Sequence, residues 1–326
     1  MKKTIMMLLL AIVSLSMLFA GGGSDAYPSR DVEVIVNAEA GGGTDTIVRK
    51  ILSVIQEKHP DSNFYVTNNG ATEANAPFEV MRAKPDGYTI GTMTYGSLVT
   101  SVYFNLIPQY DLTNLNMFCQ ITQESDAVMV RMDSPYQTFD DLIEAARQNP
   151  GKIRIGGANA GSRTSIVISE VEKAYGVDFN EVQYVGSATQ REALLNGEVE
   201  AIITSLGDLA AVIASGQVRG LVEFSSVQNE AYPDVPPIAE LGHPEIQCAS
   251  FIFFCAPKDT PEDVINTLVE YFREAQSSDE FQDWIVSIGV TPVWREGEEL
   301  KEYADTTQAN AFASLDEMVE NGTLTR

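Results

Sequence analysis

Apolar and polar positions alternate along the chain in an order typical of strands and amphipathic helices. Residues 32 to 36, VEVIV, form an apolar run between polar ends, which indicates a buried strand. Beyond a glycine loop, Ile47, Ile51 and Ile55 are spaced four apart and mark one face of a helix that ends before Pro60. The next elements are predicted as a strand at 63–68, a helix at about 73–83 and a strand at 88–94. This order predicts a parallel sheet with crossover helices.

The same order restarts in the second part of the chain. Thr138 is the expected N-cap of a helix that ends near Gly151. The segments after it are a strand at 152–158, a helix at 166–176, a strand at 181–186, a helix over SATQREALLNGE, and strands over VEAIITS and at 216–225. A proline-rich link at 234–247 leads into a strand, CASFIFFCAP, and we expect only helices after it, packed on one lobe. Two α/β units of similar size are therefore predicted.

The first residues have the layout of an export signal. Two lysines precede an apolar stretch from Ile5 to Ala20, which is shorter than the roughly 20 residues that a bilayer span needs. We therefore expect residues 1–26 to be a signal peptide, cleaved after Ala20 or Ala26, and the protein to be exported to the periplasm or cell surface. Gly21 stands where a lipoprotein would have its cysteine, so release is favoured over anchoring. An uncleaved helical tether is the alternative.

Composition restricts the partners. The chain has 326 residues, 44% of them hydrophobic, and a formal net charge of −25, which disfavours nucleic acid and anionic membrane surfaces. Its length suits two lobes, expected at 27–124 plus 248–326 and at 125–247. Only two histidines and three cysteines are present, without metal-site spacing. We expect buried free thiols, no metal, no cofactor and a monomer.

The glycine loop before the first helix is the first candidate for function. Gly41, Gly42 and Gly43 expose main-chain N–H groups at a helix N-terminus, where the helix dipole favours an anion. Thr44 adds a hydroxyl, and Asp45 could cap the helix or accept a hydrogen bond from a ligand amine or water. A tight structural turn is the alternative. The P-loop lysine is absent and Thr46 replaces the last glycine of a dinucleotide motif, which disfavours a nucleotide.

Three further loops of small and hydroxyl residues precede helices in both units, which suggests amides converging on a cleft. Together with Asp208, the candidates in these loops are Gly96, Ser97, Ala160, Gly161, Ser162, Thr164, Gly186, Ser187 and Ala188. Arg163 and Arg191 could form a fork on a ligand carboxylate, although either arginine alone is more simply a solvated residue in the first turn of a helix. No nucleophile elbow or zinc-protease motif occurs, so we expect no catalytic residue.

Five segments in order carry a resemblance to a known family. They are YPSRDVEVIV with AGGGTD, AKPDGYTIGT, YVGSATQREALLNGEVEAIIT, YPDVPPIAELGHPEI and FCAPKDTPEDVINTL. The sequence resembles the substrate-binding proteins of tripartite tricarboxylate transporters, the Bug family of periplasmic receptors, from about Tyr27 to beyond Gly289. The order of the five segments is more specific than any one of them.

The resemblance implies a two-lobed periplasmic binding protein, or Venus flytrap, with a mostly parallel sheet in each lobe. It also implies that main-chain amides hold a small carboxylate, such as a di- or tricarboxylate, which is delivered to a membrane permease. Carried over here, the ligand site comprises Gly42, Gly43, Thr44 and Asp45 in lobe one, and Ala160, Gly161, Ser162, Thr164, Gly186, Ser187 and Ala188 in lobe two.

This chain departs from the family pattern at three places. Ser165 and Ile166 stand where many members have a histidine, and Arg163 replaces a small residue. Thr189 and Gln190 replace a common Pro-Ala pair. These departures affect the identity of the ligand more than the fold. An exported hydrolase of a small ester or phosphate is the alternative function, and an effector domain of a transcription regulator would require a DNA-binding segment where the export signal lies.

Overall fold

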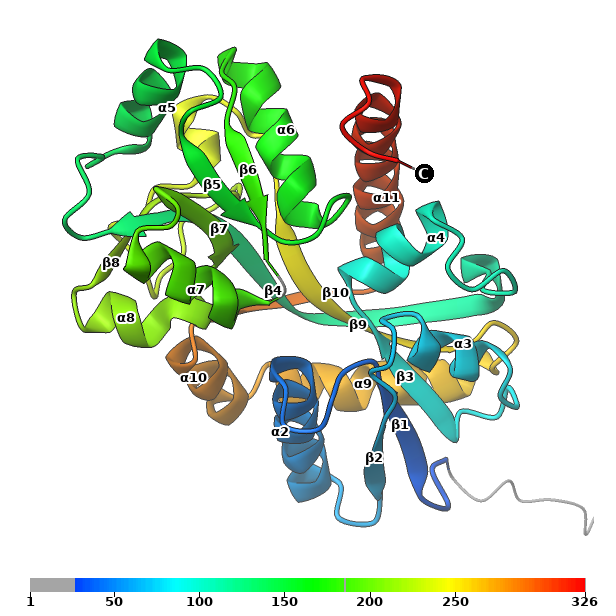
Figure 1. Ribbon diagram of the computed structural model, residues 1–326. Helices are drawn as coiled ribbons and strands as arrows, with labels where there is room; N and C mark the ends of the chain where they lie inside the picture. Colours follow the sequence, from blue (N-terminus) through cyan, green and yellow to red (C-terminus); the bar gives the residue numbers. More distant parts are fainter. Residues whose placement is uncertain (1–26, 185, 326) are drawn as a thin grey trace, which may run out of the picture.

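The computed structural model describes residues 27–184 and 186–325. The predicted signal peptide and its cleavage positions lie outside this range. Two groups of strands, each flanked by helices, form two lobes that are joined by long strands (Figure 1). The predicted two-lobed α/β class is confirmed.

Lobe one is built around the first group of strands. Strand β1 pairs in parallel with β2 and β3, as the predicted crossover units require. Strand β9 then pairs antiparallel with both β3 and β4, and β10 pairs antiparallel with β4. The elements are β1 (Val32–Val36), α2 (Gly43–Lys58), β2 (Phe64–Asn68), α3 (Asn75–Met81), β3 (Thr89–Met93), β4 (Leu115–Arg131), β9 (Ala249–Pro257), α9 (Glu262–Gln276), α10 (Asp279–Ser287) and β10 (Thr291–Arg295).

Lobe two repeats the arrangement. Strand β5 pairs in parallel with β6 and β7, and the second part of β4 pairs antiparallel with β7 and β8. The elements are α5 (Phe139–Gln148), β5 (Arg154–Gly157), α6 (Arg163–Tyr175), β6 (Asn180–Gln183), α7 (Ser187–Asn196), β7 (Ala201–Ser205), α8 (Ala210–Ala214) and β8 (Val218–Glu223). Shorter turns of helix are η1 (Gly96–Thr100), α4 (Ser101–Tyr103), η2 (Leu112–Asn114), η3 (Gly207–Leu209) and η4 (Ile238–Leu241).

The sheets are mixed rather than mostly parallel, because the strands that join the lobes run against their neighbours. From Leu115 to Ser125, β4 pairs with β9, and from Asp126 to Arg131 it pairs with β7 and β8. The chain returns from lobe two to lobe one at Cys248, whose carbonyl accepts the Asp126 N–H at 2.8 Å. The expected lobe boundaries, at 124/125 and 247/248, lie beside these two places and stay a prediction.

Two expectations for the end of the chain are wrong. Strand β10 was not expected, because it is half-buried along its length and contains Pro292, so it lacks the alternation of a typical strand. The last helix, α11 (Gly297–Glu320), contacts both lobes rather than one. Its Ser314 hydroxyl donates to Glu170 of α6 at 2.8 Å, while Leu315 lies in the lobe-one core.

Local sequence explains several elements directly. Thr138 caps α5, as predicted: its hydroxyl accepts the Asp141 N–H and its own N–H donates to the Asp141 carboxylate. The three cysteines are buried and free, also as predicted. In the part of the chain that the structure describes, no helix has the length and apolarity to cross a bilayer.

Candidate functional site

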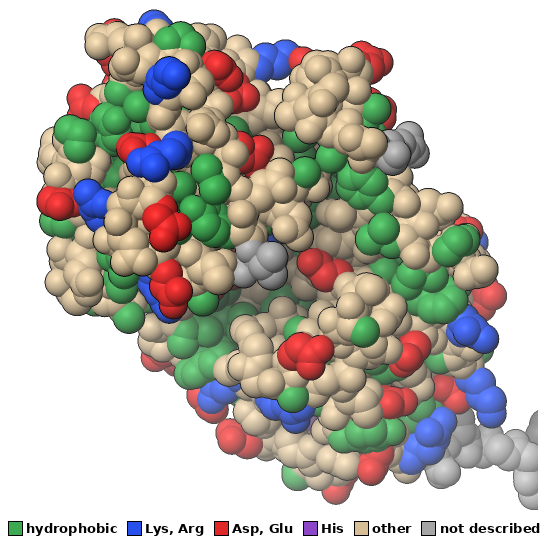
Figure 2. Space-filling view, in the orientation of Figure 1, with side chains coloured by type: hydrophobic (Ala, Val, Ile, Leu, Met, Phe, Trp, Pro, Cys, Tyr) green, Lys and Arg blue, Asp and Glu red, His purple; other side chains and the backbone are tan. Residues whose placement is uncertain are grey.

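A cavity between the lobes brings together residues from both α/β units. It has a volume of about 300 Å³ and is lined by Gly43 and Thr44 at the start of α2, by Glu124 of β4, and by Gly207 and Asp208 of η3. The remaining lining residues are Ile47, Thr122, Ser250, Phe251, Ile252, Ile288 and Val290. Figure 2 shows the surface hollowed between the two halves of the molecule. Three predicted site residues, Gly43, Thr44 and Asp208, thus share one cavity.

The N-terminus of α2 is open toward this cavity. The N-cap residue Gly42 supplies no side-chain cap. The N–H groups of Gly43 and Thr44 have no hydrogen-bond partner among residues 27–184 and 186–325. A Cβ added to Gly43 would meet no atom within 4 Å. These amides and the positive end of the helix dipole are therefore available to an anion.

Asp45 braces the glycine loop from inside. It is 2% exposed, and its carboxylate accepts the Gly41 N–H at 2.8 Å and the Asn68 side-chain amide at 2.8 Å. The Arg49 guanidinium lies 2.9 Å away. Burial opposes ionisation, but these hydrogen bonds with Arg49, Gly41 and Asn68 hold the pKa of Asp45 below its ordinary value. Asp45 was expected either to cap α2 or to accept a hydrogen bond from a ligand; the structure instead shows it accepting the Gly41 N–H, one residue before the N-cap.

The N-terminus of α6, in lobe two, is arranged differently. The Ser162 hydroxyl accepts the Ser165 N–H at 3.3 Å and so caps the helix. The Thr164 hydroxyl is buried and accepts the Ala158 N–H at 2.8 Å. Ala160 is exposed, whereas Gly161 is buried, and a Cβ there would lie 2.9 Å from the Phe104 ring of lobe one. These side chains hold the loop and bring it against lobe one.

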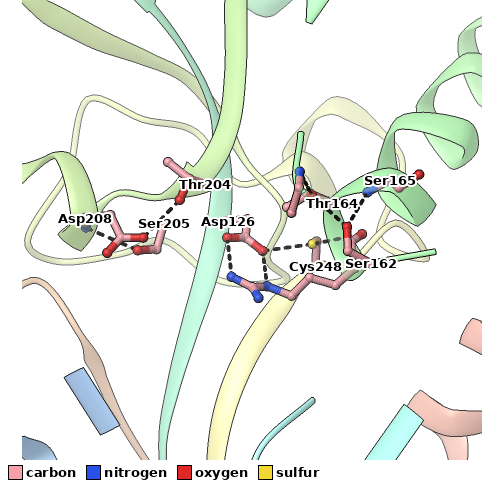
Figure 3. A network of polar contacts seen from close by, with 10 residues as sticks. Asp126, Ser162, Thr164, Ser165, Thr204, Ser205, Asp208 and Cys248 are labelled. Atoms are coloured by element: carbon pink, nitrogen blue, oxygen red, sulfur yellow. Dashed lines mark hydrogen bonds and ion pairs between the residues drawn. The ribbon is translucent and has the colours of Figure 1, made fainter. Parts of the chain in front are cut away.

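Arg163 already has a carboxylate partner within the protein. Its Nε and Nη2 atoms lie 2.5 and 3.0 Å from the two carboxylate oxygens of Asp126, which is fully buried. The Cys248 thiol donates to the same carboxylate at 3.0 Å (Figure 3). Burial raises the pKa of that thiol, and the Asp126 charge raises it further. The expected arginine fork is thus occupied by Asp126; Arg191, on α7, has no ion-pair partner in the described chain.

The loop of Gly96 and Ser97 is covered. The Ser97 hydroxyl accepts the Thr94 N–H at 2.8 Å and donates to the Thr94 carbonyl at 2.9 Å. The Glu73 carboxylate lies over Gly96, because a Cβ added there would fall 2.0 Å from Glu73 Oε2. Thr94 donates its hydroxyl to the same oxygen at 2.7 Å. A ligand can reach this loop only if Glu73 moves.

The start of α7 offers a second open helix end. Gly186, its N-cap residue, supplies no side-chain cap and has a φ of 83°, and it is exposed together with Ala188. The N–H groups of Ser187 and Ala188 have no hydrogen-bond partner within the described ranges. Gly186, Ser187 and Ala188 do not line the cavity itself.

The cavity also holds an acidic side chain that sequence reasoning missed. The pKa of Glu124 is raised to about 7, chiefly by burial and also by the charges of Asp208 and Asp126, against the lowering effect of the Ser205 hydroxyl and Arg163. Asp208 is exposed and accepts the Thr204 hydroxyl at 3.0 Å. With 46 acidic residues in the chain, no spacing distinguishes Glu124 from the others.

A larger cavity of about 410 Å³ lies elsewhere. It is lined by α11 residues, the loop around Glu245, and Glu170 of α6. None of the predicted site residues lines it. Within the described residues, no group of three or more His, Cys, Asp or Glu side chains is placed to hold a metal ion.

Comparison with known proteins gives consistent results. Residues 49–318 match the tripartite tricarboxylate transporter family receptor. The chain is 27% identical to Protein BugT of Bordetella pertussis, with 87% of this chain and 89% of that protein covered. It is 25% identical to a TctC solute-binding protein from Polaromonas, with a TM-score of 0.79 and coverages of 89% and 99%. A protein of R. palustris solved with adipate is also 25% identical, with a TM-score of 0.74 and coverages of 89% and 97%.

Proposed function

Because the chain belongs to the tripartite tricarboxylate transporter receptor family, we propose that it captures a small carboxylate between its lobes and delivers it to the membrane permease of such a transporter. Receptors of this family are solute-binding proteins of the periplasm, and the proposed role is binding rather than catalysis. The adipate in the R. palustris relative supports a carboxylate as the ligand class.

One observation carries this proposal: the uncapped start of α2 lies in a cavity that both lobes line. The amides of Gly43 and Thr44 are placed to donate to a carboxylate, and the Thr44 hydroxyl adds a third donor. Each hydrogen bond to a charged group contributes roughly 1.5–3 kcal/mol. Three such bonds at the upper end of this range reach the roughly 8 kcal/mol of micromolar binding; with fewer or weaker bonds, contacts from lobe two must supply the rest once the lobes close.

Of the remaining predicted residues, some contact the ligand in this proposal and others support the walls of the cleft. Gly42 shapes the turn into α2, and Asp45 holds that turn rigid. Gly186, Ser187 and Ala188 reach the ligand from lobe two once the lobes close. Ala160, Gly161, Ser162, Arg163 and Thr164 support that wall, and Gly96 and Ser97 support the wall of lobe one.

Closure is proposed to occur about the two strand crossings. Strand β4 changes partners between Ser125 and Asp126, and β9 starts at Ala249. Rotation there moves whole sheets without breaking their internal pairing. The liganded, closed form is then the surface that the permease recognises.

The test is to identify and titrate the solute. Mass spectrometry of the solute released by denaturing purified protein, followed by calorimetry with that compound, should reveal a small carboxylic acid bound at one site per chain. Failure of a folded, ligand-stripped protein to bind any monocarboxylate, dicarboxylate or amino acid would contradict the proposal.

A further inference from the structure

We propose that the cleft selects a small carboxylate that also carries an ammonium group, in preference to a dicarboxylate of the same length. This inference rests on the proposed function, since it concerns the second end of a ligand whose first carboxylate lies at α2. It is carried by the charges that line the cleft, which differ from those expected around a doubly anionic ligand.

The cavity has donors on one wall and acceptors on the other. Gly43 and Thr44 supply the donors, while Glu124 and Asp208 are the charged side chains of the lining. Among the described residues, no lysine, arginine or histidine lines it. A Cβ added to Gly207 would lie 2.9 Å from Glu124 Oε1, so the Glu124 carboxylate lies directly against η3, the turn that carries Asp208. Two carboxylates therefore sit close together without a cation between them.

The Asp208 carboxylate can still accept a hydrogen bond from a ligand. Asp208 accepts the Thr204 hydroxyl through Oδ2, and in the described chain its Oδ1 has no hydrogen-bond partner. Asp208 is exposed at the cavity. A ligand ammonium placed between Asp208 and Glu124 would pair with both carboxylates through charge-assisted hydrogen bonds.

The rest of the cleft adds negative charge rather than positive charge. Glu73 lies over Gly96 in lobe one, and its loop adjoins the glycine loop, since Gly70 packs against the backbone of Ala38. In lobe two, the guanidinium of Arg163 is bound by Asp126. A second ligand carboxylate therefore meets the like charges of Glu124 and Asp208, which repel it.

Matched ligands that differ only at one end test this inference. The pairs are 3-aminopropanoate with succinate and 5-aminopentanoate with adipate, in which an ammonium replaces one carboxylate. Calorimetry at pH 8 keeps Glu124 ionised. We expect the amino acid of at least one pair to bind about tenfold or more tightly than its dicarboxylate, because one charged hydrogen bond is worth roughly that factor.

Variants then assign the preference to the two carboxylates. Glu124→Gln and Asp208→Asn should each weaken the preferred amino acid about tenfold. Neither variant should weaken propanoate or pentanoate, which lack the ammonium, because removing a nearby negative charge does not disfavour a carboxylate. Asp133→Asn is the matched control, because Asp133 is exposed and pairs with Arg131 away from the cavity. Thermal melting confirms that each variant is folded.

The outcomes separate the two proposals. If dicarboxylates bind as tightly as their amino partners or more tightly, the charge inference is overturned and the receptor function stands. If no carboxylate of either kind binds the folded wild-type protein, both are overturned. If the amino acids bind more tightly than the dicarboxylates but neither variant reduces their affinity, the assignment to Glu124 and Asp208 is overturned.

Discussion

The two glycine-containing loops before α2 and α6 have similar composition but different structures. In lobe one, Gly42 leaves the first turn of α2 uncapped, so its amides remain free. In lobe two, the Ser162 and Thr164 hydroxyls accept N–H groups of Ser165 and Ala158, so they are already bonded within the loop. The comparison shows that small residues before a helix do not alone make an anion site. What matters is whether a neighbouring side chain already satisfies the amides.

The charged residues of the two loops show the same distinction. Asp45 and Arg163 were both expected at the ligand, and each is paired inside the protein, with Arg49 and Asp126 respectively. These pairs hold the loops in place. We therefore predict that Asp45 and Arg163 position the amides of these loops rather than contact the ligand.

The largest expected effect comes from blocking the open loop. Gly43→Val places a branched side chain in the cavity without an internal clash. It should weaken carboxylate binding at least 100-fold while the protein stays folded, because it would displace at least two charged hydrogen bonds. Calorimetry measures this effect. Thr46→Val, an exposed site in the same turn that does not line the cavity, is the control and should change affinity less than threefold. Normal affinity in Gly43→Val would remove α2 from the site.

The buried ion pair of lobe two should matter more for stability than the half-exposed pair of lobe one. Arg163→Ala leaves Asp126 buried without its guanidinium partner and should cost about 3 kcal/mol of unfolding free energy. Arg49→Ala should cost about 1 kcal/mol or less, because Arg49 is 50% exposed and Asp45 keeps Gly41 and Asn68. Urea unfolding of both variants makes the comparison, and equal losses would contradict it.

Glu223 in lobe two and Asp45 in lobe one should have opposite effects on folding stability as pH changes. Burial raises the pKa of Glu223 from 4.5 to about 7, and its Oε2 has no hydrogen-bond partner. The stability that protonated Glu223 contributes is present below pH 4.5 and is lost as pH rises through 7. Asp45, with its lowered pKa, loses its contribution only as pH falls into the acid range.

Glu223→Gln tests this difference directly. The variant should be more stable than the wild type by up to about 3 kcal/mol at pH 8, since each pKa unit corresponds to about 1.4 kcal/mol. The gain should shrink toward zero at pH 4. Unfolding free energies across this range give the measurement, and a gain that does not depend on pH would show that Glu223 is not the titrating group.

The last comparison concerns the cap of α6. Ser162→Ala removes the hydroxyl that accepts the Ser165 N–H and should cost about 1 kcal/mol of stability. In contrast, Gly43→Ala at the uncapped start of α2 removes no hydrogen bond, and its Cβ would meet no atom within 4 Å. Thermal melts compare the two, and a loss in Gly43→Ala as large as that in Ser162→Ala would contradict the distinction between a capped and an open helix end.

Much of the fold could be predicted from local pattern. Strand β1, helix α2 and the Thr138 cap of α5 follow from apolar spacing and capping chemistry, which act over a few residues. Strand β10 could not be found, because its partner β4 lies far away in sequence and Pro292 breaks its pattern. Antiparallel pairing at the lobe junction likewise depends on contacts that no short segment encodes.

For the site, sequence predicted the loops but not the charges around them. The pairing of Arg163 with Asp126 spans 37 residues, and Glu73 covers Gly96 from a different loop. Glu124 has no spacing that separates it from other acids. Such partners are set by tertiary packing, so the identity of the open amides becomes visible only in the structure.

The central claim is that the first amides of α2 hold the ligand carboxylate. The most direct measurement is the ¹⁵N–¹H NMR spectrum during titration with 3-aminopropanoate or succinate, whichever binds more tightly. The account predicts that the Gly43 and Thr44 amide protons shift downfield in proportion to occupancy and that the Ser165 amide changes little. Saturable binding that leaves the Gly43 and Thr44 resonances in place would contradict it.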